Sequence, residues 1–200
     1  MNKIGLDLAY RTVGISIVTE DRLLYTSYDL SKERFPTPIA IYHMVDKVWE
    51  TIKPYLSTPH ILVMEEIFKG KWDNLKNIAR VQGAVIDRYI QQTGLCPDLV
   101  LATEARNRLG IPGIAPKVAI QLWVLDTCNL NELKRLDKVY KTKIEETIEL
   151  YYKFYRSKQK GDRRRVRELE AILEKQTLKV AELTGLDNHM ADAIVLALGA

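Results

Sequence analysis

The fold follows from the stretch IGLDLA at residues 4–9. Its side chains alternate in size in the manner of a β-strand, in which successive residues point to opposite faces. One face carries the large apolar side chains of Ile4, Leu6 and Leu8, and the other carries Gly5, Asp7 and Ala9. A carboxylate in the middle of an apolar strand is costly to bury unless it is paired or binds a metal. Asp7 is therefore the first candidate functional residue; the alternative is an acid paired with a buried Lys or Arg.

The sequence on either side of this strand predicts an α/β protein with a mixed sheet. Residues 13–17 alternate again, and residues 22–29 return as a third strand, which makes an antiparallel meander. The later elements are expected, in chain order, to be a helix between Pro36 and Pro54, a buried strand at 61–64, a helix at 74–92, a strand at 99–102, a helix at 116–126 and a final helix at 188–198.

The length of 200 residues fits one domain, residues 1–200, with an insertion at residues 131–184. In the insertion, a T-x-x-E capping box at Thr142 and Glu145 and two apolar stripes predict a helical hairpin with basic outer faces. Fifteen of the 30 Lys and Arg residues lie between Lys134 and Lys179, together with ten acids between Glu132 and Glu182. Such a stretch suits either a nucleic-acid partner or a solvated helical face.

Several classes of protein are disfavoured. The N-terminus has no apolar core of a secretion signal, and no apolar run approaches the roughly 20 residues that span a bilayer. Cys96 and Cys128 give no disulfide framework. We therefore expect a cytoplasmic protein without a membrane partner. No G-x-G-x-x-G or G-K-[ST] loop is present, so a nucleotide cofactor is not expected.

Further candidate residues lie at the end of the buried strand and at the start of the last helix. Glu65 and Glu66 end the buried strand, and since side chains alternate, one of the two is expected to face a shared site with Asp7. His189 and Asp192 share one face of the last helix at spacing i, i+3. Asp187 is expected to cap this helix or to serve as a fifth acid near the site.

Three carboxylates and an imidazole favour Mg²⁺ or Mn²⁺ as the bound ion, because hard oxygen donors suit these ions. Two such ions about 4 Å apart would activate a water and stabilise the leaving oxygen of a phosphodiester. The sequence therefore predicts a site with two metal ions, built from Asp7, one of Glu65 and Glu66, His189 and Asp192.

The same motifs resemble a known family. Gly5-Leu6-Asp7 with Thr12-Val13-Gly14 looks like the opening strand pair of RuvC-type Holliday-junction resolvases, which are RNase H-like nucleases. Residues 64–68, MEEIF, resemble their second motif, and His189-x-x-Asp192-Ala193 resembles their last one. The resemblance covers residues 1 to about 128 and 185–200. It implies an RNase H-like mixed five-stranded sheet flanked by helices, with the hairpin inserted before the C-terminal helix.

The resemblance also implies residue roles. Asp7 would bridge both metals, Glu65 rather than Glu66 would be the strand-end ligand, and His189 would ligate or lie beside one ion. Lys117 falls where the family carries a basic residue near the scissile phosphate, and Arg106 or Arg108 matches another. The nucleic-acid-binding residues expected in all are Phe68, Lys69, Lys71, Arg106, Arg108, Lys117, Arg163, Arg164 and Arg165.

The implied partner is branched DNA such as a four-way junction, cut by a homodimer that would form through the helix around Ala79 to Tyr89. Phe68 matches an aromatic that the family stacks on unpaired bases at the junction centre. Its alternative is a core phenylalanine, and Trp72 could do the same job. The insertion at 131–184 is absent from the usual short resolvases, which puts the substrate geometry in doubt. Two alternatives stay open: an RNase H-like nuclease acting on RNA or RNA/DNA hybrid, and a non-catalytic nucleic-acid-binding module.

Overall fold

The computed structural model describes residues 1–67, 72–157 and 162–200, without the side chains of residues 72–74. Within these ranges the chain forms two compact units. The first unit comprises residues 1–113 and 192–200, and the second comprises residues 114–191. Phe68, Lys69 and Lys71, which were expected to bind nucleic acid, lie outside the described residues, as does the side chain of Trp72.

The first unit is built on a mixed sheet, as the sequence predicts. The described residues form five strands in the order β3-β2-β1-β4-β5. The strands are β1 (Asn2–Leu8), β2 (Thr12–Val18), β3 (Leu23–Asp29), β4 (His60–Glu65) and β5 (Asp98–Val100). β1, β2 and β3 form the expected antiparallel meander, whereas β4 runs parallel to β1 and β5 parallel to β4.

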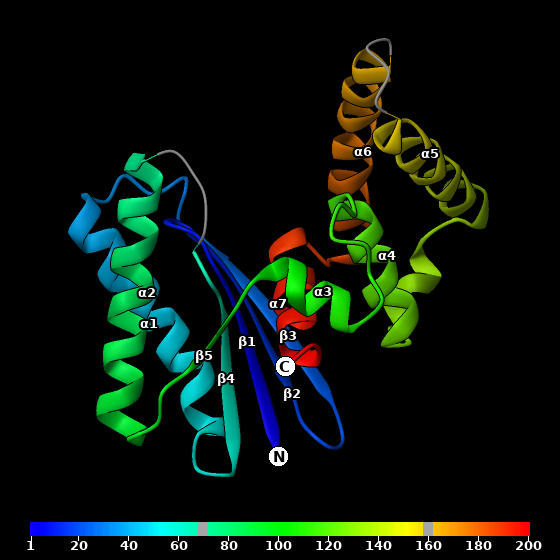
Figure 1. Cartoon of the computed structure of the whole chain (residues 1–200). Coiled ribbons are helices and arrows are strands. Elements are labelled where there is room, and N and C mark those ends of the chain that lie inside the picture. The colour runs from blue at the N-terminus through cyan, green and yellow to red at the C-terminus, as the bar shows by residue number, and fades with distance from the viewer. Residues whose placement is uncertain (68–71, 158–161) are drawn as a thin grey trace. The chain divides into compact units, whose positions relative to one another are not determined.

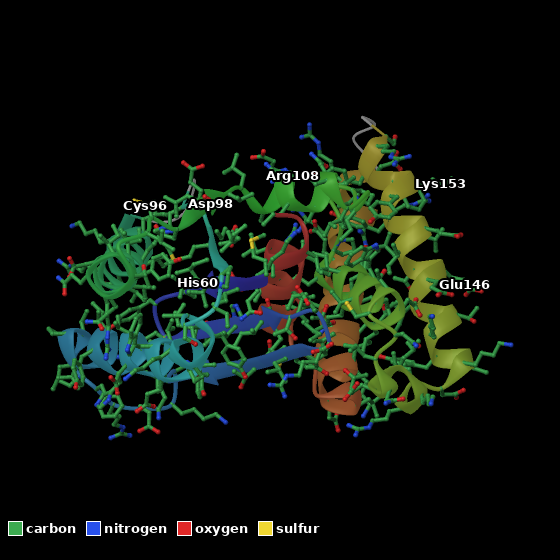
Figure 2. The ribbon with its side chains drawn as sticks, turned by 90° about the horizontal axis from the view of Figure 1, so that it is seen from below. His60, Cys96, Asp98, Arg108, Glu146 and Lys153 are labelled. Carbon is green, nitrogen blue, oxygen red and sulfur yellow. The ribbon has the colours of Figure 1, made fainter. Side chains whose placement is uncertain are left out.

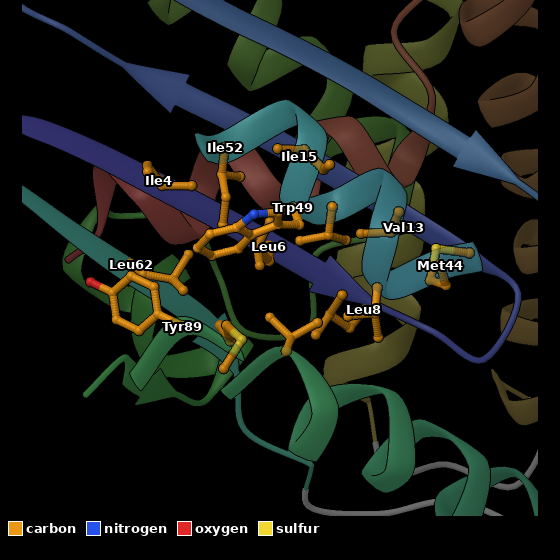
Figure 3. Close-up of a cluster of buried hydrophobic side chains, with 14 of the residues drawn as sticks. Ile4, Leu6, Leu8, Val13, Ile15, Met44, Trp49, Ile52, Leu62 and Tyr89 are labelled. Atoms are coloured by element: carbon orange, nitrogen blue, oxygen red, sulfur yellow. The ribbon is translucent and has the colours of Figure 1, made fainter. Parts of the chain in front are cut away.

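One face of this sheet is covered by α1 (Thr37–Ile52) and α2 (Trp72–Thr93), as Figure 1 shows. α1 is followed directly by a single turn of 3-10 helix, η1 (Lys53–Tyr55), which contains Pro54. The apolar alternation of β1 points into the core between these layers (Figure 3). Its members include Ile4, Leu6, Leu8, Val13, Ile15, Met44, Trp49, Ile52, Leu62 and Tyr89. Burial of these side chains is the main stabilising term of this unit.

The opposite face of β1 receives the C-terminal residues of α7 (Asn188–Leu198). A Cβ atom on Gly5 would overlap the carbonyl oxygen of Ala193 and lie 2.9 Å from the backbone nitrogen of Ala197. The Ser16 hydroxyl, directly across the strand pair from Gly5, donates a hydrogen bond of 2.8 Å to the same carbonyl oxygen of Ala193. The helix backbone thus lies directly on the strand because Gly5 has no side chain.

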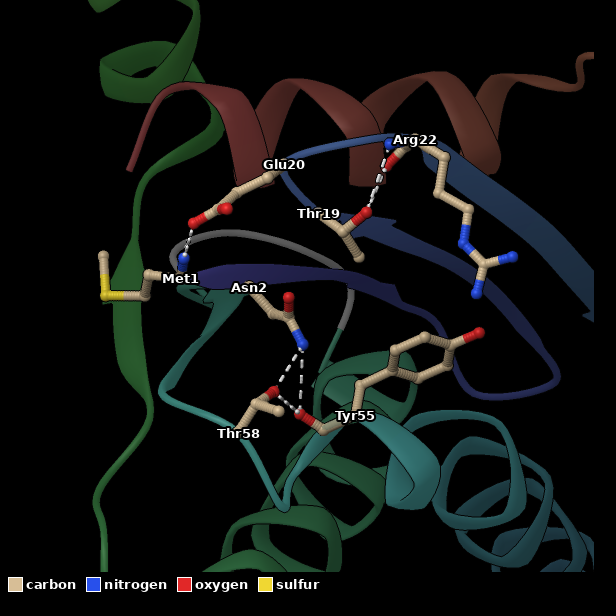
Figure 4. Close-up of polar contacts among 7 residues, drawn as sticks. All are labelled: Met1, Asn2, Thr19, Glu20, Arg22, Tyr55 and Thr58. Carbon is tan, nitrogen blue, oxygen red and sulfur yellow. Dashed lines mark hydrogen bonds and ion pairs between the residues drawn. The ribbon is translucent and has the colours of Figure 1, made fainter.

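The beginning of β1 is held by polar contacts at the end of the strand remote from Asp7 (Figure 4). The amino group of Met1 lies 3.0 Å from a carboxylate oxygen of Glu20. The Asn2 amide donates to the Thr58 hydroxyl over 2.8 Å. These contacts join the start of β1 to the β2–β3 turn and to the loop before β4.

The second unit is helical. It comprises α4 (Lys117–Thr127), the 3-10 helix η2 (Asn131–Arg135), α5 (Lys138–Arg156) and α6 (Asp162–Thr184), with α5 and α6 packed against each other. The Asp137 carboxylate accepts a hydrogen bond of 3.1 Å from the backbone N–H of Val139 and caps α5. The capping box predicted at Thr142 and Glu145 is therefore wrong, since the helix starts one turn earlier.

The second unit is held by a buried polar side chain as well as by apolar packing. The Gln121 side chain of α4 is fully buried and donates a hydrogen bond of 2.8 Å to the carbonyl oxygen of Leu186. This bond ties α4 to the segment that precedes α7. In the described part of the chain, no helix has the length and apolar character needed to cross a membrane.

Candidate active site

Asp7 and Glu65 lie side by side at the carboxyl ends of two neighbouring parallel strands. In the register of β1 and β4, Gly5 is opposite Val63 and Leu6 is opposite Met64. One residue further, Asp7 and Glu65 are neighbours on the face opposite the apolar core. Gly14 is opposite Asp7 on β2, so no side chain crowds the carboxylate from that strand. A hydrogen bond joins the side chains of Glu65 and Asp7.

A third carboxylate comes from the end of the chain. Asp192 of α7 is close enough to Glu65 for its charge to raise the pKa of Glu65. Both Asp7 and Asp192 are buried, with 7% and 9% of their surfaces exposed. Three acidic side chains in so little solvent need compensating charge or protons, because burial strongly disfavours an unpaired carboxylate.

One compensation is a proton on Glu65. Burial, the charge of Asp7, the hydrogen bond with Asp7 and the charge of Asp192 together raise the pKa of Glu65 to about 7. Glu65 also lines a cavity of about 360 Å³, together with Leu8, Leu75 and Leu101. At neutral pH, Glu65 is therefore shared between its protonated and ionised forms.

The other compensation is the guanidinium of Arg106, which lies on α3 (Ala102–Arg108). Its Nη2 donates a hydrogen bond of 2.8 Å to Oδ1 of Asp192, and both side chains are largely buried. The same charge opposes the rise in the pKa of Glu65. The Nε of Arg106 is buried and has no hydrogen-bond partner among the described residues. Arg106 thus supplies a positive charge that partly neutralises the carboxylates of the site.

Arg108, the alternative to Arg106, is directed elsewhere. Its guanidinium donates to the carbonyl oxygen of Gly199 over 2.9 Å and to the carboxylate of Glu104 over 2.7 Å. Figure 2 labels Arg108 on α3, where about half of its side chain is exposed. Of the two arginines, only Arg106 contacts one of the three acids through a bond in the described structure.

The donor set suits a divalent cation, although its arrangement is not that of a formed metal site. Carboxylate oxygens are the ligands that Mg²⁺ and Mn²⁺ prefer. Among the described residues, no group of three or more His, Cys, Asp or Glu side chains is placed so that it could hold a metal ion. The internal pairing accounts for this, since Glu65 bonds with Asp7 and Asp192 bonds with Arg106. A cation would have to replace the proton of Glu65 and the guanidinium of Arg106.

The remaining predicted residues are distributed over both units. Glu66 is exposed and lines the 360 Å³ cavity beside Glu65. Asp187 caps α7, because its carboxylate accepts a hydrogen bond of 2.8 Å from the backbone N–H of Met190. His189 lies in the first turn of α7 and Lys117 begins α4. Both belong to the second unit, so their part in the acidic site stays a prediction.

Two features of the site were not predicted from the sequence. The helix α3 was not expected, and with it the ion pair between Arg106 and Asp192 was missed. The second is the close contact of α7 with Gly5. A signal for the latter existed, since Gly5 interrupts a strand and Ala191, Ala193 and Ala197 keep the last helix narrow.

Comparison with known proteins identifies the fold of the chain. No family model matches the sequence, and no curated protein matches it. Two solved structures of Thermus thermophilus RuvC match the whole chain, and each shares 16% identity with it. The structure of that protein in complex with a Holliday junction substrate gives a TM-score of 0.55 over 91% of its chain. The second RuvC structure gives 0.56 over 92%.

The chain has the RuvC fold. This is an RNase H-like fold, and it confirms the predicted mixed five-stranded sheet flanked by helices. On this RuvC fold, the paired carboxyl groups of Asp7 and Glu65 stand at the carboxyl ends of β1 and β4. Ligands of α/β sheets commonly bind at such strand ends, where neighbouring loops and helix starts leave room. The acidic cluster therefore occupies the position in the sheet at which a functional site is expected.

Proposed function

We propose that the chain is a metal-dependent endonuclease that cuts four-way junctions or other branched DNA. The observation that carries the proposal is the cluster of the buried Asp7 and Asp192 with the half-buried Glu65 on a RuvC fold, the pKa of Glu65 being raised to about 7. A cluster with surplus negative charge in a sparsely solvated site is a functional candidate, since perturbed acids concentrate where charge is put to use.

Asp7, Glu65, Asp192 and His189 would hold the two Mg²⁺ or Mn²⁺ ions of this proposal. Such a metal pair, when bound, supplies an activated water and stabilises the leaving oxygen of a phosphodiester. The residues of the chain position the donors: β1 and β4 fix Asp7 and Glu65, and the contact with Gly5 fixes Asp192 along α7.

Arg106 has a second role in this proposal. In the metal-free chain it neutralises Asp192. With Asp192 holding a metal ion, the guanidinium of Arg106 would be free to bind a phosphate oxygen, as arginine does with two parallel N–H donors. Lys117 remains a proposed second contact to the scissile phosphate.

The proposed substrate class draws on the RuvC neighbour whose structure contains a Holliday junction. A symmetric four-way junction requires two equivalent cuts, and a symmetric homodimer supplies two active sites. The exposed side of α2 is the proposed contact surface. Ala79 and Gly83 are exposed there and carry little side chain, whereas Val81, Val85 and Tyr89 face the core.

The test is the variant Asp7→Asn, which keeps the shape of the side chain and removes its charge. We expect Mg²⁺-dependent cutting of a labelled four-way junction to fall by at least about 100-fold, as when one electrostatic group of an active site is lost. Junction binding, measured by gel shift without Mg²⁺, should persist. Asp21→Asn is the matched control, because Asp21 is an exposed acid of the β2–β3 turn.

The same assay also tests the alternative substrates. An RNA/DNA hybrid and a structured RNA are incubated in parallel with the junction. Cutting of RNA substrates alone would overturn the DNA proposal, and unchanged junction cutting by Asp7→Asn would remove this site from the reaction. Binding without any cutting in Mg²⁺ or Mn²⁺ would indicate the non-catalytic module.

A further inference from the structure

A groove of about 490 Å³ lies within the second unit, at the end of the α5–α6 helical pair where α5 ends and α6 begins. The last turn of α5 contributes Phe154 and Tyr155, and the first turns of α6 contribute Arg163, Arg167 and Glu170. Its volume falls within the range of roughly 300–1,000 Å³ that is usual for small-molecule sites. Nothing in the proposed cleavage reaction uses this groove.

The aromatic side of the groove is formed by the ring of Tyr155, which packs against protein on one side and is exposed on the other. Tyr155 is 46% exposed. Its ring centroid lies 5.3 Å from that of Tyr151, a buried residue of the same helix. One side of the Tyr155 ring is thus supported by protein while the remainder faces solvent. Beside it, the guanidinium of Arg165 lies 5.0 Å from the centre of the Phe154 ring.

The basic side of the groove carries charge that the protein leaves uncompensated. Arg163 and Arg167 are exposed, and neither forms an ion pair with any described residue. Arg164, between them in sequence, forms an ion pair of 2.9 Å with Glu168. Arg165 is committed to the Phe154 ring. The two arginines that line the groove are therefore available to an anion, and Glu170 is the one acid among the groove residues named above.

Charge is also segregated along the helical pair. Among the described residues between 153 and 168, six are basic and two are acidic. The acids of α5 gather earlier in the helix, at Glu145, Glu146 and Glu149. In Figure 2, Lys153 and Glu146 mark these two parts of α5. A polyanion is thus attracted to the end of the helical pair that holds the groove.

We propose that this groove binds unpaired nucleotides of a DNA strand, with a base stacked on Tyr155 and flanking phosphates on Arg163 and Arg167. Aromatic rings that stack bases, combined with a basic track for the backbone, are the usual means of binding single strands, and they tolerate any base. A base in a duplex offers no free face to such a ring. The proposal shares the substrate class of the proposed nuclease but does not depend on cleavage.

The test measures binding of a fluorescein-labelled 12-nucleotide oligothymidine to the full chain, by anisotropy and without divalent metal. Tyr155→Ala should weaken binding by about fivefold or more, whereas Tyr155→Phe, which retains the ring, should stay within about twofold of the unaltered chain. Far-ultraviolet circular dichroism checks that the helices of each variant are intact.

Charge variants test the basic side. Arg163→Gln and Arg167→Gln should each weaken binding and lower the slope of log K against log salt by about 0.7, the value for one phosphate contact on a single strand. Arg164→Gln is the matched control: it removes the same charge from the same helix, but from an arginine already paired with Glu168. Its affinity and salt slope should change by less than half as much.

Four results would overturn the proposal. They are unchanged binding by Tyr155→Ala, equal losses in the three arginine variants, a 12-base-pair duplex bound as tightly as the single strand, and binding of oligouridine but not oligothymidine. Junction cutting is assayed separately in Mg²⁺. Loss of cutting with Tyr155-dependent binding intact would count against the nuclease alone, and the reverse pattern would count against the groove alone.

Discussion

At the scale of single residues, the charge of the acidic site depends on one proton, that of Glu65. Its pKa is about 7 because the side chain is buried beside Asp7 and Asp192. In the unfolded chain the same carboxyl has an ordinary pKa of 4.5. The folded protein therefore binds this proton more tightly than the unfolded one, and stability must depend on pH.

The pH dependence has a definite sign. The stabilising contribution of the Glu65 proton is fully present below about pH 4.5 and is lost as the pH rises through about 7. Within this window we expect the free energy of unfolding of the metal-free chain, measured with urea, to fall by at most about 1.4 kcal/mol per pH unit. Glu65→Gln should flatten this part of the profile. Parallel profiles for the two proteins would contradict the assignment.

Arg106 is the residue on which the metal-free site depends. Arg106→Met leaves Asp192 buried without its partner and should cost about 3 kcal/mol of unfolding free energy, as breaking a buried ion pair does. Mg²⁺ should recover part of the loss if Asp192 binds it. Arg108→Met is the control, since that arginine is half exposed and should cost no more than about 1 kcal/mol. Equal losses for both variants would contradict the expectation that the buried Arg106–Asp192 pair contributes more than the exposed Arg108–Glu104 pair.

At the scale of elements, the contact between β1 and α7 places Asp192. A methyl group at Gly5 would overlap the backbone of Ala193, which cannot yield as a flexible side chain would. Gly5→Ala should therefore destabilise the chain by about 1–3 kcal/mol and, by displacing α7, also reduce cutting. Thermal unfolding and junction cleavage are the measurements.

Gly83→Ala is the matched control for that variant. A Cβ at Gly83 meets nothing within 4 Å, and the residue lies within α2. Here the same substitution should stabilise the chain by up to about 1 kcal/mol, because alanine favours helix more than glycine does. If both substitutions acted alike, the close approach at Gly5 would not be what decides the outcome.

At the scale of the whole molecule, the proposed dimer makes a prediction for the exposed side of α2. A large charged side chain at Gly83 would enter the proposed interface without disturbing the core, because nothing lies near its Cβ. Gly83→Arg should shift the chain to a monomer in sedimentation equilibrium and abolish paired cuts across a junction, while its thermal unfolding midpoint stays close to that of the unaltered chain. A chain that is monomeric with and without junction DNA would contradict the dimer.

The elements themselves were largely predictable. Strand alternation, the helical stripes and the Pro and Gly signals identified β1 to β5, α1, α2, α4 and α7, since these patterns act over a few neighbouring residues. The short helix α3 escaped because seven residues carry too little periodicity. The start of α5 was placed at Thr142 instead of Asp137 because the T-x-x-E pattern was given more weight than the single capping residue Asp137, although aspartate is the stronger cap of the two.

The sequence by itself determined which face of β1 is apolar, that Asp7 interrupts the other face, and which acids are candidates, because residue type and spacing alone carry this information. Only the tertiary structure decided that Asp192 pairs with Arg106, 86 residues away in the chain, and that Glu65 shares a hydrogen bond with Asp7. Such pairings follow from the strand register and from the packing of α7 against Gly5. They are set by packing between distant segments, which no local pattern encodes.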